Sequence, residues 1–262
     1  IGGGIVGLSI AYQLIERNIW KNIIIIDKEK SLGMHTSGRN SGVLHAGIYY
    51  KPGSLKAKVC IEGSKRLQKW IKERSLSINK CGKIILPTKN HLDHQLDLLL
   101  KRGKTNGAVV EMIDKKRLYE LEPYAESSSD RALWSPNTVV INPKEILMQI
   151  ENELIEKGVL ILKNQTIKKI FSDKKEIHTN DNSIFKFKYF FNCAGLQSDR
   201  IAHLCNVGKK YTILPFKGLY WKLKNSNKFN IKTNIYPVPD LSVPFLGVHF
   251  TPNAEKIRTI YI

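Results

Sequence analysis

The sequence predicts a protein of the α/β class (α+β overall), in which a domain built on a parallel sheet is interrupted by a second domain with an antiparallel sheet. Three observations predict this fold. A glycine motif opens an amphipathic helix, an apolar strand ends in an acid, and short strand-like pieces rich in Pro and aromatic residues dominate after residue 211. The 262 residues, 42% of them apolar, suffice for one or two domains.

The first 27 residues predict a turn, a helix and a strand. The helix has one apolar side, made of Ile5, Leu8, Ala11, Leu14 and Ile15. The strand over residues 23–26 is apolar throughout, which is typical of a parallel sheet buried on both faces, and it ends at Asp27.

The middle of the chain begins with a loop. Residues 31–50 are rich in Gly, Ser, His and Asn, and therefore predict a long loop. The pattern beyond it predicts, in order, a helix over residues 55–73, a strand over 83–86, a helix over 92–102 and a strand over 109–113.

A further helix starts at Asn142, which can cap it, with Pro143 in the first turn and Glu145 completing a capping box, and it should end at Gly158. Later elements are expected as strands over 159–162, 166–171 and 185–193, a short helix over 199–204, and strands over 219–223, 235–237 and 245–250. The predicted parallel-sheet domain comprises residues 1–80 and 142–214, and the second domain comprises residues 81–141 and 215–262.

Both ends of the chain look interrupted. Ile1 leads directly into the glycine turn, and residues 259–262 read as the middle of a strand. We expect a fragment that is truncated at its carboxyl end and has lost any targeting peptide.

The net charge of +19 has two interpretations, an anionic partner such as nucleic acid or a membrane, or lysines dispersed over solvated faces. No five consecutive residues are basic, which favours dispersed lysines and no nucleic acid, and leaves peripheral membrane contact open. No apolar run approaches the ~18 residues of a membrane span.

The sequence has four cysteines, and their spacing does not match that of zinc ligands: Cys60, Cys81, Cys193 and Cys205. We therefore expect reduced thiols in an intracellular protein without a metal.

The glycine motif is Gly2-x-Gly4-x-x-Gly7, and Asp27 follows Gly7 at the spacing of a dinucleotide fold. The glycines let a pyrophosphate approach the helix N-terminus, and Asp27 would accept hydrogen bonds from the adenosine ribose. The alternative is a tight turn without a ligand. The motif does not distinguish NAD from FAD. In residues 37–50 small residues alternate with hydrogen-bond donors, which is expected of a loop that runs along a cofactor. The alternative is an ordinary glycine-rich surface loop.

Residues 2–27 and 37–50 resemble the D-amino-acid oxidase-like superfamily of FAD enzymes, and residues 41–57 are similar to the L-2-hydroxyglutarate dehydrogenase/oxidase family. Further matches, in the same order, are residues 81–83, 215–218, 236–240 and 244–251. The resemblance covers nearly the whole chain. It departs from the family at Asp27, where Glu is usual, and after Pro252, where the family's chains continue.

The resemblance implies a glutathione-reductase-like FAD-binding domain and an antiparallel substrate domain. The cofactor residues that it implies are Gly2, Gly4, Gly7, Asp27, Lys28, Arg39, Asn40, Ser41, Gly42, Ile167, Ala194, Gly195 and Asp199. The small-residue turn at 194–195 would approach the phosphates or ribitol, or is only a strand-to-helix turn.

The resemblance also implies oxidation of L-2-hydroxyglutarate to 2-oxoglutarate, with hydride transfer to the flavin. His45 is the expected base, since a histidine suits removal of the hydroxyl proton; otherwise it only bonds the flavin or the loop. His249 is the rival base and His35 a weaker candidate.

A dicarboxylate needs cationic anchors and hydrogen-bond donors. Lys217 and Arg39 are the candidate cations, and Tyr49, Tyr50 and Tyr220 the candidate donors. Each of them has an ordinary structural alternative. The expected electron acceptor is a quinone or oxygen, and the expected location is the cytoplasm or the periphery of the inner membrane. Oxidation of an amino acid, an amine or glycerol 3-phosphate, and an inactive remnant, stay open.

Overall fold

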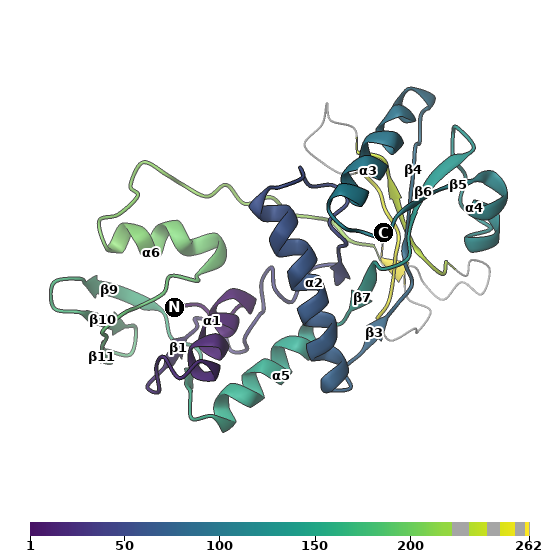
Figure 1. Ribbon diagram of the computed structural model, residues 1–262. Helices are drawn as coiled ribbons and strands as arrows, with labels where there is room; N and C mark the ends of the chain where they lie inside the picture. The colour runs from purple at the N-terminus through teal and green to yellow at the C-terminus, as the bar shows by residue number, and fades with distance from the viewer. Residues whose placement is uncertain (222–230, 240–246, 255–259, 262) are drawn as a thin grey trace. The chain divides into compact units, whose positions relative to one another are not determined.

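The computed structural model describes residues 1–221, 231–239, 247–254 and 260–261 (Figure 1). The chain divides into two compact units, of which unit 1 contains Ile1–Asn40 and Pro143–Gly218, and unit 2 contains Ser41–Asn142 and Leu219–Ile262. The expected boundaries differ from this division, because residues 41–80 belong to unit 2. The reason is strand pairing: β2 (Val43–Leu44) and β3 (Ile78–Asn79) both pair with β7 (Val139–Ile141).

Unit 1 begins with the predicted turn, helix and strand. Helix α1 (Ile5–Glu16) buries Leu8 and Ala11. Strand β1 (Ile24–Ile26) pairs in parallel with β8 (Leu160–Leu162), as the apolar run predicted. Helix α5 (Pro143–Glu156) packs beside α1 and buries four aliphatic side chains. Parallel pairing between strands so distant in sequence requires the crossover connection that a dinucleotide fold provides.

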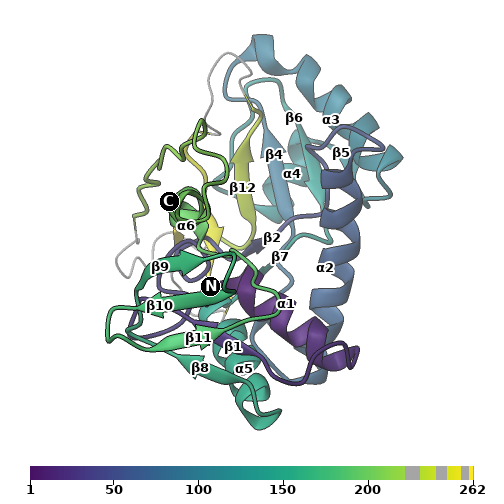
Figure 2. The ribbon, with the colours of Figure 1, turned by 90° about the vertical axis from the view of Figure 1, so that its left-hand side faces the viewer.

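The rest of unit 1 is an antiparallel meander of β9 (Ile167–Phe171), β10 (Glu176–Thr179) and β11 (Ile184–Lys186), which Figure 2 shows as one small sheet. It is followed by η2 (Gly195–Gln197) and α6 (Ser198–Leu204). The strand expected over residues 185–193 was wrong beyond Lys186. The chain there packs Phe187 and Phe190 into an apolar cluster and hydrogen-bonds the backbone of Ile1.

Unit 2 is built on a sheet with the strand order β12 (Asn234–Pro237), β4 (Lys83–Leu86), β6 (Arg131–Ser135) and β5 (Glu111–Asp114). The pairs β4–β6 and β5–β6 are antiparallel, as expected for this domain. The pair β12–β4 is parallel, whereas the sequence predicted an antiparallel sheet here. All four residues of β4 are buried, so this strand lies at the centre of the unit.

Smaller pieces complete unit 2. Helix α2 (Leu55–Glu73) has the predicted bounds, and the Ser54 side chain accepts a hydrogen bond from the Ala57 N–H. The remaining helices are η1 (Asn90–Leu92), α3 (His94–Thr105) and α4 (Lys115–Leu121), and β13 (Thr251–Pro252) pairs with β14 (Ile260–Tyr261). Of the late predicted strands, 219–221 has no regular structure, 222–223 and 245–246 lie outside the described residues, and Phe250 forms one bridge to Ile235.

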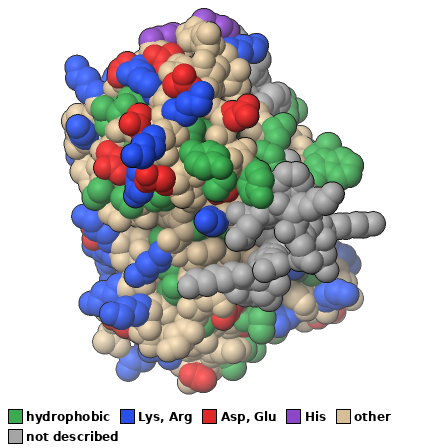
Figure 3. Space-filling model, turned by 90° about the vertical axis from the view of Figure 1, so that its right-hand side faces the viewer, with side chains coloured by type: hydrophobic (Ala, Val, Ile, Leu, Met, Phe, Trp, Pro, Cys, Tyr) green, Lys and Arg blue, Asp and Glu red, His purple; other side chains and the backbone are tan. Residues whose placement is uncertain are grey.

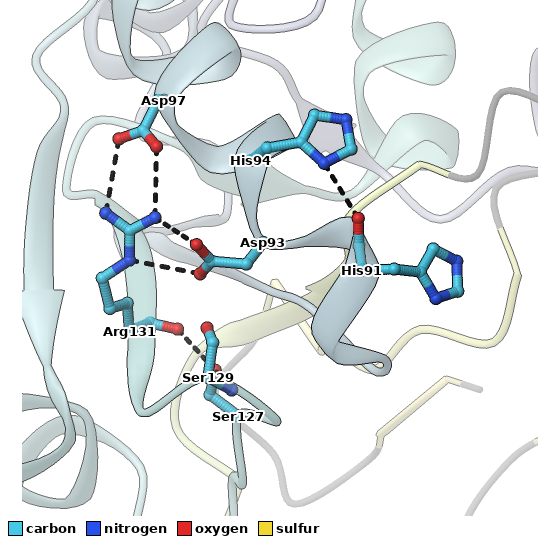
Figure 4. Close-up of polar contacts among 7 residues, drawn as sticks. All are labelled: His91, Asp93, His94, Asp97, Ser127, Ser129 and Arg131. Carbon is cyan, nitrogen blue, oxygen red and sulfur yellow. Dashed lines mark hydrogen bonds and ion pairs between the residues drawn. The ribbon is translucent and has the colours of Figure 1, made fainter.

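An ion-pair network ties α3 to the sheet of unit 2 (Figure 4). The Arg131 guanidinium donates to both carboxylate oxygens of Asp93, and it donates to Asp97 Oδ2 at 3.1 Å. Planar two-point pairing of this kind fixes geometry better than a single contact. The network therefore sets the position of α3 over β6.

On one face of the molecule the charged side chains are dispersed. Figure 3 shows one face on which Lys and Arg side chains are scattered, with Asp and Glu side chains between them. Among the described residues, no helix is both long and apolar enough to cross a membrane.

Candidate functional site

The glycine motif of unit 1 has a geometry that larger residues cannot adopt. Gly2 has a φ of +102°, and a Cβ on it would lie 2.3 Å from the Cys193 carbonyl oxygen. A Cβ on Gly7 would lie 2.0 Å from the Gly2 carbonyl oxygen. Both glycines therefore bring backbone segments into direct contact at the start of α1.

The N-terminus of α1 leaves donors free for an anion. Its N-cap, Gly4, provides no side-chain cap, and Ile5 N–H donates to Ser37 Oγ at 2.9 Å. Within the described part of the chain, the N–H groups of Gly4, Val6 and Gly7 have no protein acceptor. Free N–H groups at a helix N-terminus, where the helix dipole is positive, suit a phosphate.

Asp27 lies beside these glycines at the end of β1. Its Oδ2 accepts from Gly3 N–H at 2.6 Å, and its Oδ1 accepts from Glu29 N–H at 2.8 Å. The two bonds hold the carboxylate in one orientation, and each oxygen keeps a further lone pair. A fixed acceptor beside a phosphate-binding turn fits the ribose of a dinucleotide, so these residues fit FAD.

The other predicted cofactor residues of unit 1 have local contacts. Lys28 pairs with Glu29 on the surface, and Arg39 is exposed. The Asn40 amide donates to the carbonyl oxygens of Thr36 and Ser37. These contacts stabilise the loop that contains the three residues, and the roles of the three in cofactor binding stay predictions.

The carboxyl part of unit 1 also holds predicted residues. Asp199 accepts from the N–H of Ile213 at 2.9 Å and holds that segment, and the half-buried Ile167 packs in the apolar cluster of the meander. Gly195 has a φ of +56° after Ala194, so this turn needs a residue that tolerates the left-handed region. Ser41 and Gly42, by contrast, belong to unit 2, where the Gly42 carbonyl accepts from Ile141 N–H.

Unit 2 holds a second cluster, around His45. Lys83 Nζ lies 3.0 Å from His45 Nδ1, although the two residues are 38 positions apart in the sequence. Lys83 is only 1% exposed. Among the described residues no carboxylate forms an ion pair with it. The cluster therefore contains a buried amine whose polar partner is a histidine.

Burial governs the charges in this cluster. Loss of solvation lowers the pKa of Lys83 to about 7, so its ammonium and amine forms are both accessible near neutral pH. Burial, followed by the positive charges of Lys83 and His249, lowers the pKa of His45 to about 3. His45 is therefore a neutral imidazole at physiological pH, as a proton acceptor must be.

Aromatic rings enclose the amine. Lys83 Nζ lies 4.3 Å from the ring centre of Tyr236 and 5.2 Å from that of Tyr49. The ring centre of Tyr236 lies 4.4 Å from that of His249 and 6.4 Å from that of His45, so both candidate bases lie beside the same tyrosine. The buried Tyr49 hydroxyl has no hydrogen-bond partner within the described part of the chain. An unused buried donor beside a buried amine is typical of a ligand site.

The remaining predicted substrate residues lie at the surface or have other contacts. Lys217 and Tyr220 lie on the exposed segment 211–221, which has neither helix nor strand. The half-buried Tyr50 ring contacts Lys56 Nζ at 5.1 Å. His35 pairs with Glu29 on the surface of unit 1. The roles of these residues stay predictions.

Lys83 and Tyr236 were missed as site residues, although both lie in matched segments. The usable signal was a lysine at the start of an apolar strand, since residues 83–86 otherwise contain only Ile and Leu. A lysine is almost never fully buried without a partner or a function.

Unit 1 also has a cavity of about 500 Å³. It is lined mainly by aliphatic and aromatic side chains of α1, β1 and residues 185–191, which are poor candidates for catalysis.

The fold and the glycine–acid site together define a class of protein. Residues 1–260 match the family model described as FAD dependent oxidoreductase. The chain belongs to this family, whose cofactor is FAD.

The names of curated relatives are more specific than the description of the family. The chain is 41% identical over 260 residues to "L-2-hydroxyglutarate dehydrogenase, mitochondrial" of Caenorhabditis briggsae, covering 96% of this chain and 59% of the relative. It is 36% identical to the protein of that name from Homo sapiens, covering 97% of this chain and 58% of the relative. The chain thus spans less than two thirds of the length of these relatives.

Solved structures share the fold. L-alpha-glycerophosphate oxidase from Mycoplasma pneumoniae with FAD bound superimposes with a TM-score of 0.82 at 24% identity, covering 100% of this chain and 68% of that chain. Glycine oxidase from Geobacillus kaustophilus gives a TM-score of 0.80 at 16% identity, covering 99% of this chain and 68% of that chain.

Proposed function

We propose that this protein oxidises L-2-hydroxyglutarate to 2-oxoglutarate with FAD. The observation that carries the proposal is the buried cluster of His45, Lys83 and Tyr49, which combines a neutral base, an amine and an unused hydroxyl. The names of the curated relatives support the choice of substrate. A 2-hydroxy acid offers both the hydroxyl proton and the carboxylate that such a cluster can bind.

The cofactor would be held by unit 1. Gly4, Val6 and Gly7 would donate backbone N–H groups to its pyrophosphate, and Asp27 would accept from its ribose. FAD, when bound, supplies the two-electron oxidation of the alcohol carbon.

The base would be His45 of unit 2. Its Nδ1 faces Lys83, which leaves Nε2 to accept the hydroxyl proton. Tyr49 would donate to a substrate oxygen, and burial of the cluster would exclude water from the reacting atoms. Lys217, Arg39 and Tyr220 are proposed to anchor the carboxylates, with His249 as the alternative base.

The test is an anaerobic absorbance spectrum of the protein reconstituted with FAD. L-2-hydroxyglutarate should bleach the band of the bound oxidised flavin, and the D isomer should not. Bleaching by glycerol 3-phosphate or an amino acid instead would reject the proposed substrate. Bound flavin that no 2-hydroxy acid reduces would reject the proposed reaction.

The electron acceptor and the cellular location stay predictions. A quinone or oxygen would reoxidise the flavin, and the dispersed basic surface would favour peripheral contact with an anionic inner membrane. The curated relatives are named as mitochondrial proteins, which supports this location. Stopped-flow reoxidation with a soluble quinone and with oxygen, each in excess, would identify the acceptor.

A further inference from the structure

The contact between Lys83 and His45 constrains which of their nitrogen atoms carries the shared hydrogen. Lys83 Nζ and His45 Nδ1 are 3.0 Å apart, so one hydrogen lies between the two nitrogens. An ammonium can only donate, and a neutral imidazole carries its single proton on one of its two nitrogens. A Lys83 ammonium therefore fixes the His45 proton on Nε2, whereas a neutral Lys83 amine, which has a lone pair, allows that proton to lie on Nδ1.

Two states of the pair differ in whether Nε2 can act as a base. In the first state the Lys83 ammonium donates to Nδ1, so the His45 proton is on Nε2, and Nε2 cannot act as a base. In the second state the Lys83 amine accepts from the Nδ1–H group, and Nε2 has a free lone pair. Passing from the first state to the second releases one proton from the pair.

We propose that Lys83 is a positioning residue that switches the tautomer of His45, so that Nε2 is a base only when Lys83 is a neutral amine. This inference rests on the proposed role of His45 in alcohol oxidation. The neutral amine also helps the reaction, because it accepts from the Nδ1–H of the imidazolium that forms when Nε2 takes the substrate proton.

The surroundings of Lys83 permit the neutral form. The groups that face the pair are Tyr49, Tyr236 on β12, His249, Cys60 on α2 and Cys81 next to β4. The Cys60 thiol donates to the His45 carbonyl oxygen at 3.4 Å, and burial raises the pKa values of Cys60, Cys81 and Tyr49. The Cys60 and Cys81 thiols and the Tyr49 phenol are therefore neutral near pH 7, and none of these three is a counter-ion that would keep the ammonium charged.

The experiment measures the tautomer directly, without substrate. In ¹⁵N-labelled protein, long-range ¹H–¹⁵N correlation spectra are recorded from pH 6 to 9, and the His45 ring is assigned by its absence in His45→Gln. We expect Nε2 to change from the protonated to the unprotonated shift, and Nδ1 to change oppositely, with a midpoint near pH 7. A Nε2 that stays protonated up to pH 9 would overturn the proposal and leave Lys83 as a simple ammonium anchor.

Variants separate the switch from a structural role. Lys83→Arg keeps a permanent cation and should hold Nε2 in the protonated form at every pH. Lys83→Met removes the partner and should abolish the transition near pH 7. The matched control is Lys115→Met, which removes an exposed lysine of α4 and should titrate like the wild type.

Kinetics on the FAD-bound protein provide a second readout. Wild-type kcat/KM should rise with pH with an apparent pKa near 7, and Lys83→Arg should lower it at least ~100-fold at pH 8, the smallest usual contribution of a general base. Retention of the rise in Lys83→Arg would contradict the switch. A tautomer change without turnover of L-2-hydroxyglutarate would reject the proposed function and leave the switch intact.

Discussion

Lys83 has a cost in stability that follows from its burial. Its pKa in the folded protein, about 7, lies below the ordinary value of 10.5. The unfolded chain therefore binds more protons than the folded protein between these values, and stability rises with pH through this window. The cost is complete below pH 7 and vanishes above pH 10.5.

Replacing Lys83 with Met should therefore stabilise the protein while it impairs the proposed reaction. The difference between these two pKa values corresponds to a gain of about 4 kcal/mol in the free energy of unfolding near pH 7. Urea unfolding at pH 7 and pH 10.5 measures it. An equal gain at both pH values would show that packing, and not charge, is responsible.

At the scale of elements, the turn before α1 depends on glycine. Gly7→Ala should lower FAD affinity at least ~10-fold and destabilise the protein by ~1–3 kcal/mol, because its Cβ would overlap the Gly2 carbonyl oxygen at 2.0 Å. The matched control is Gly63→Ala within α2, where a Cβ meets nothing within 4 Å. The control should gain about 1 kcal/mol in helix propensity and bind FAD normally.

Helix α3 gives a second prediction at this scale. Arg131→Lys keeps the charge but loses the planar fork that engages both Asp93 and Asp97, so it should cost about 1 kcal/mol. The hydrogen bond from Arg131 lowers the pKa of Asp93, so the wild-type advantage should be complete above the ordinary Asp pKa and decrease as the pH falls below it. Thermal unfolding of both proteins at pH 7 and pH 3 measures this difference. An undiminished difference at pH 3 would contradict the ion-pair explanation.

At the scale of the whole molecule, the cofactor should act as a stabilising ligand. FAD that binds only the folded chain adds about 2.7 kcal/mol at a concentration of 100 Kd. The Tm should therefore rise continuously with FAD concentration, and Gly7→Ala should weaken this dependence. NAD at the same concentrations is the control, since the family model specifies FAD. An equal shift with NAD would contradict FAD specificity.

The features that depend on neighbouring residues could be predicted from the sequence. The glycine turn, α1, β1 and the position of Asp27 follow from a short pattern, and α2 spans residues 55–73 as its periodicity predicted. Capping, periodicity and glycine conformation act over a few residues, so one sequence is enough to read them.

The contacts between distant segments became evident only in the folded chain. It placed residues 41–80 in unit 2, added β12 in parallel beside β4, and brought Lys83 to His45. Strand pairing and burial depend on contacts between residues far apart in the chain, which local patterns do not encode. For the same reason a lysine that reads as an ordinary charged residue in the sequence lies in the fold as a buried amine beside the proposed base.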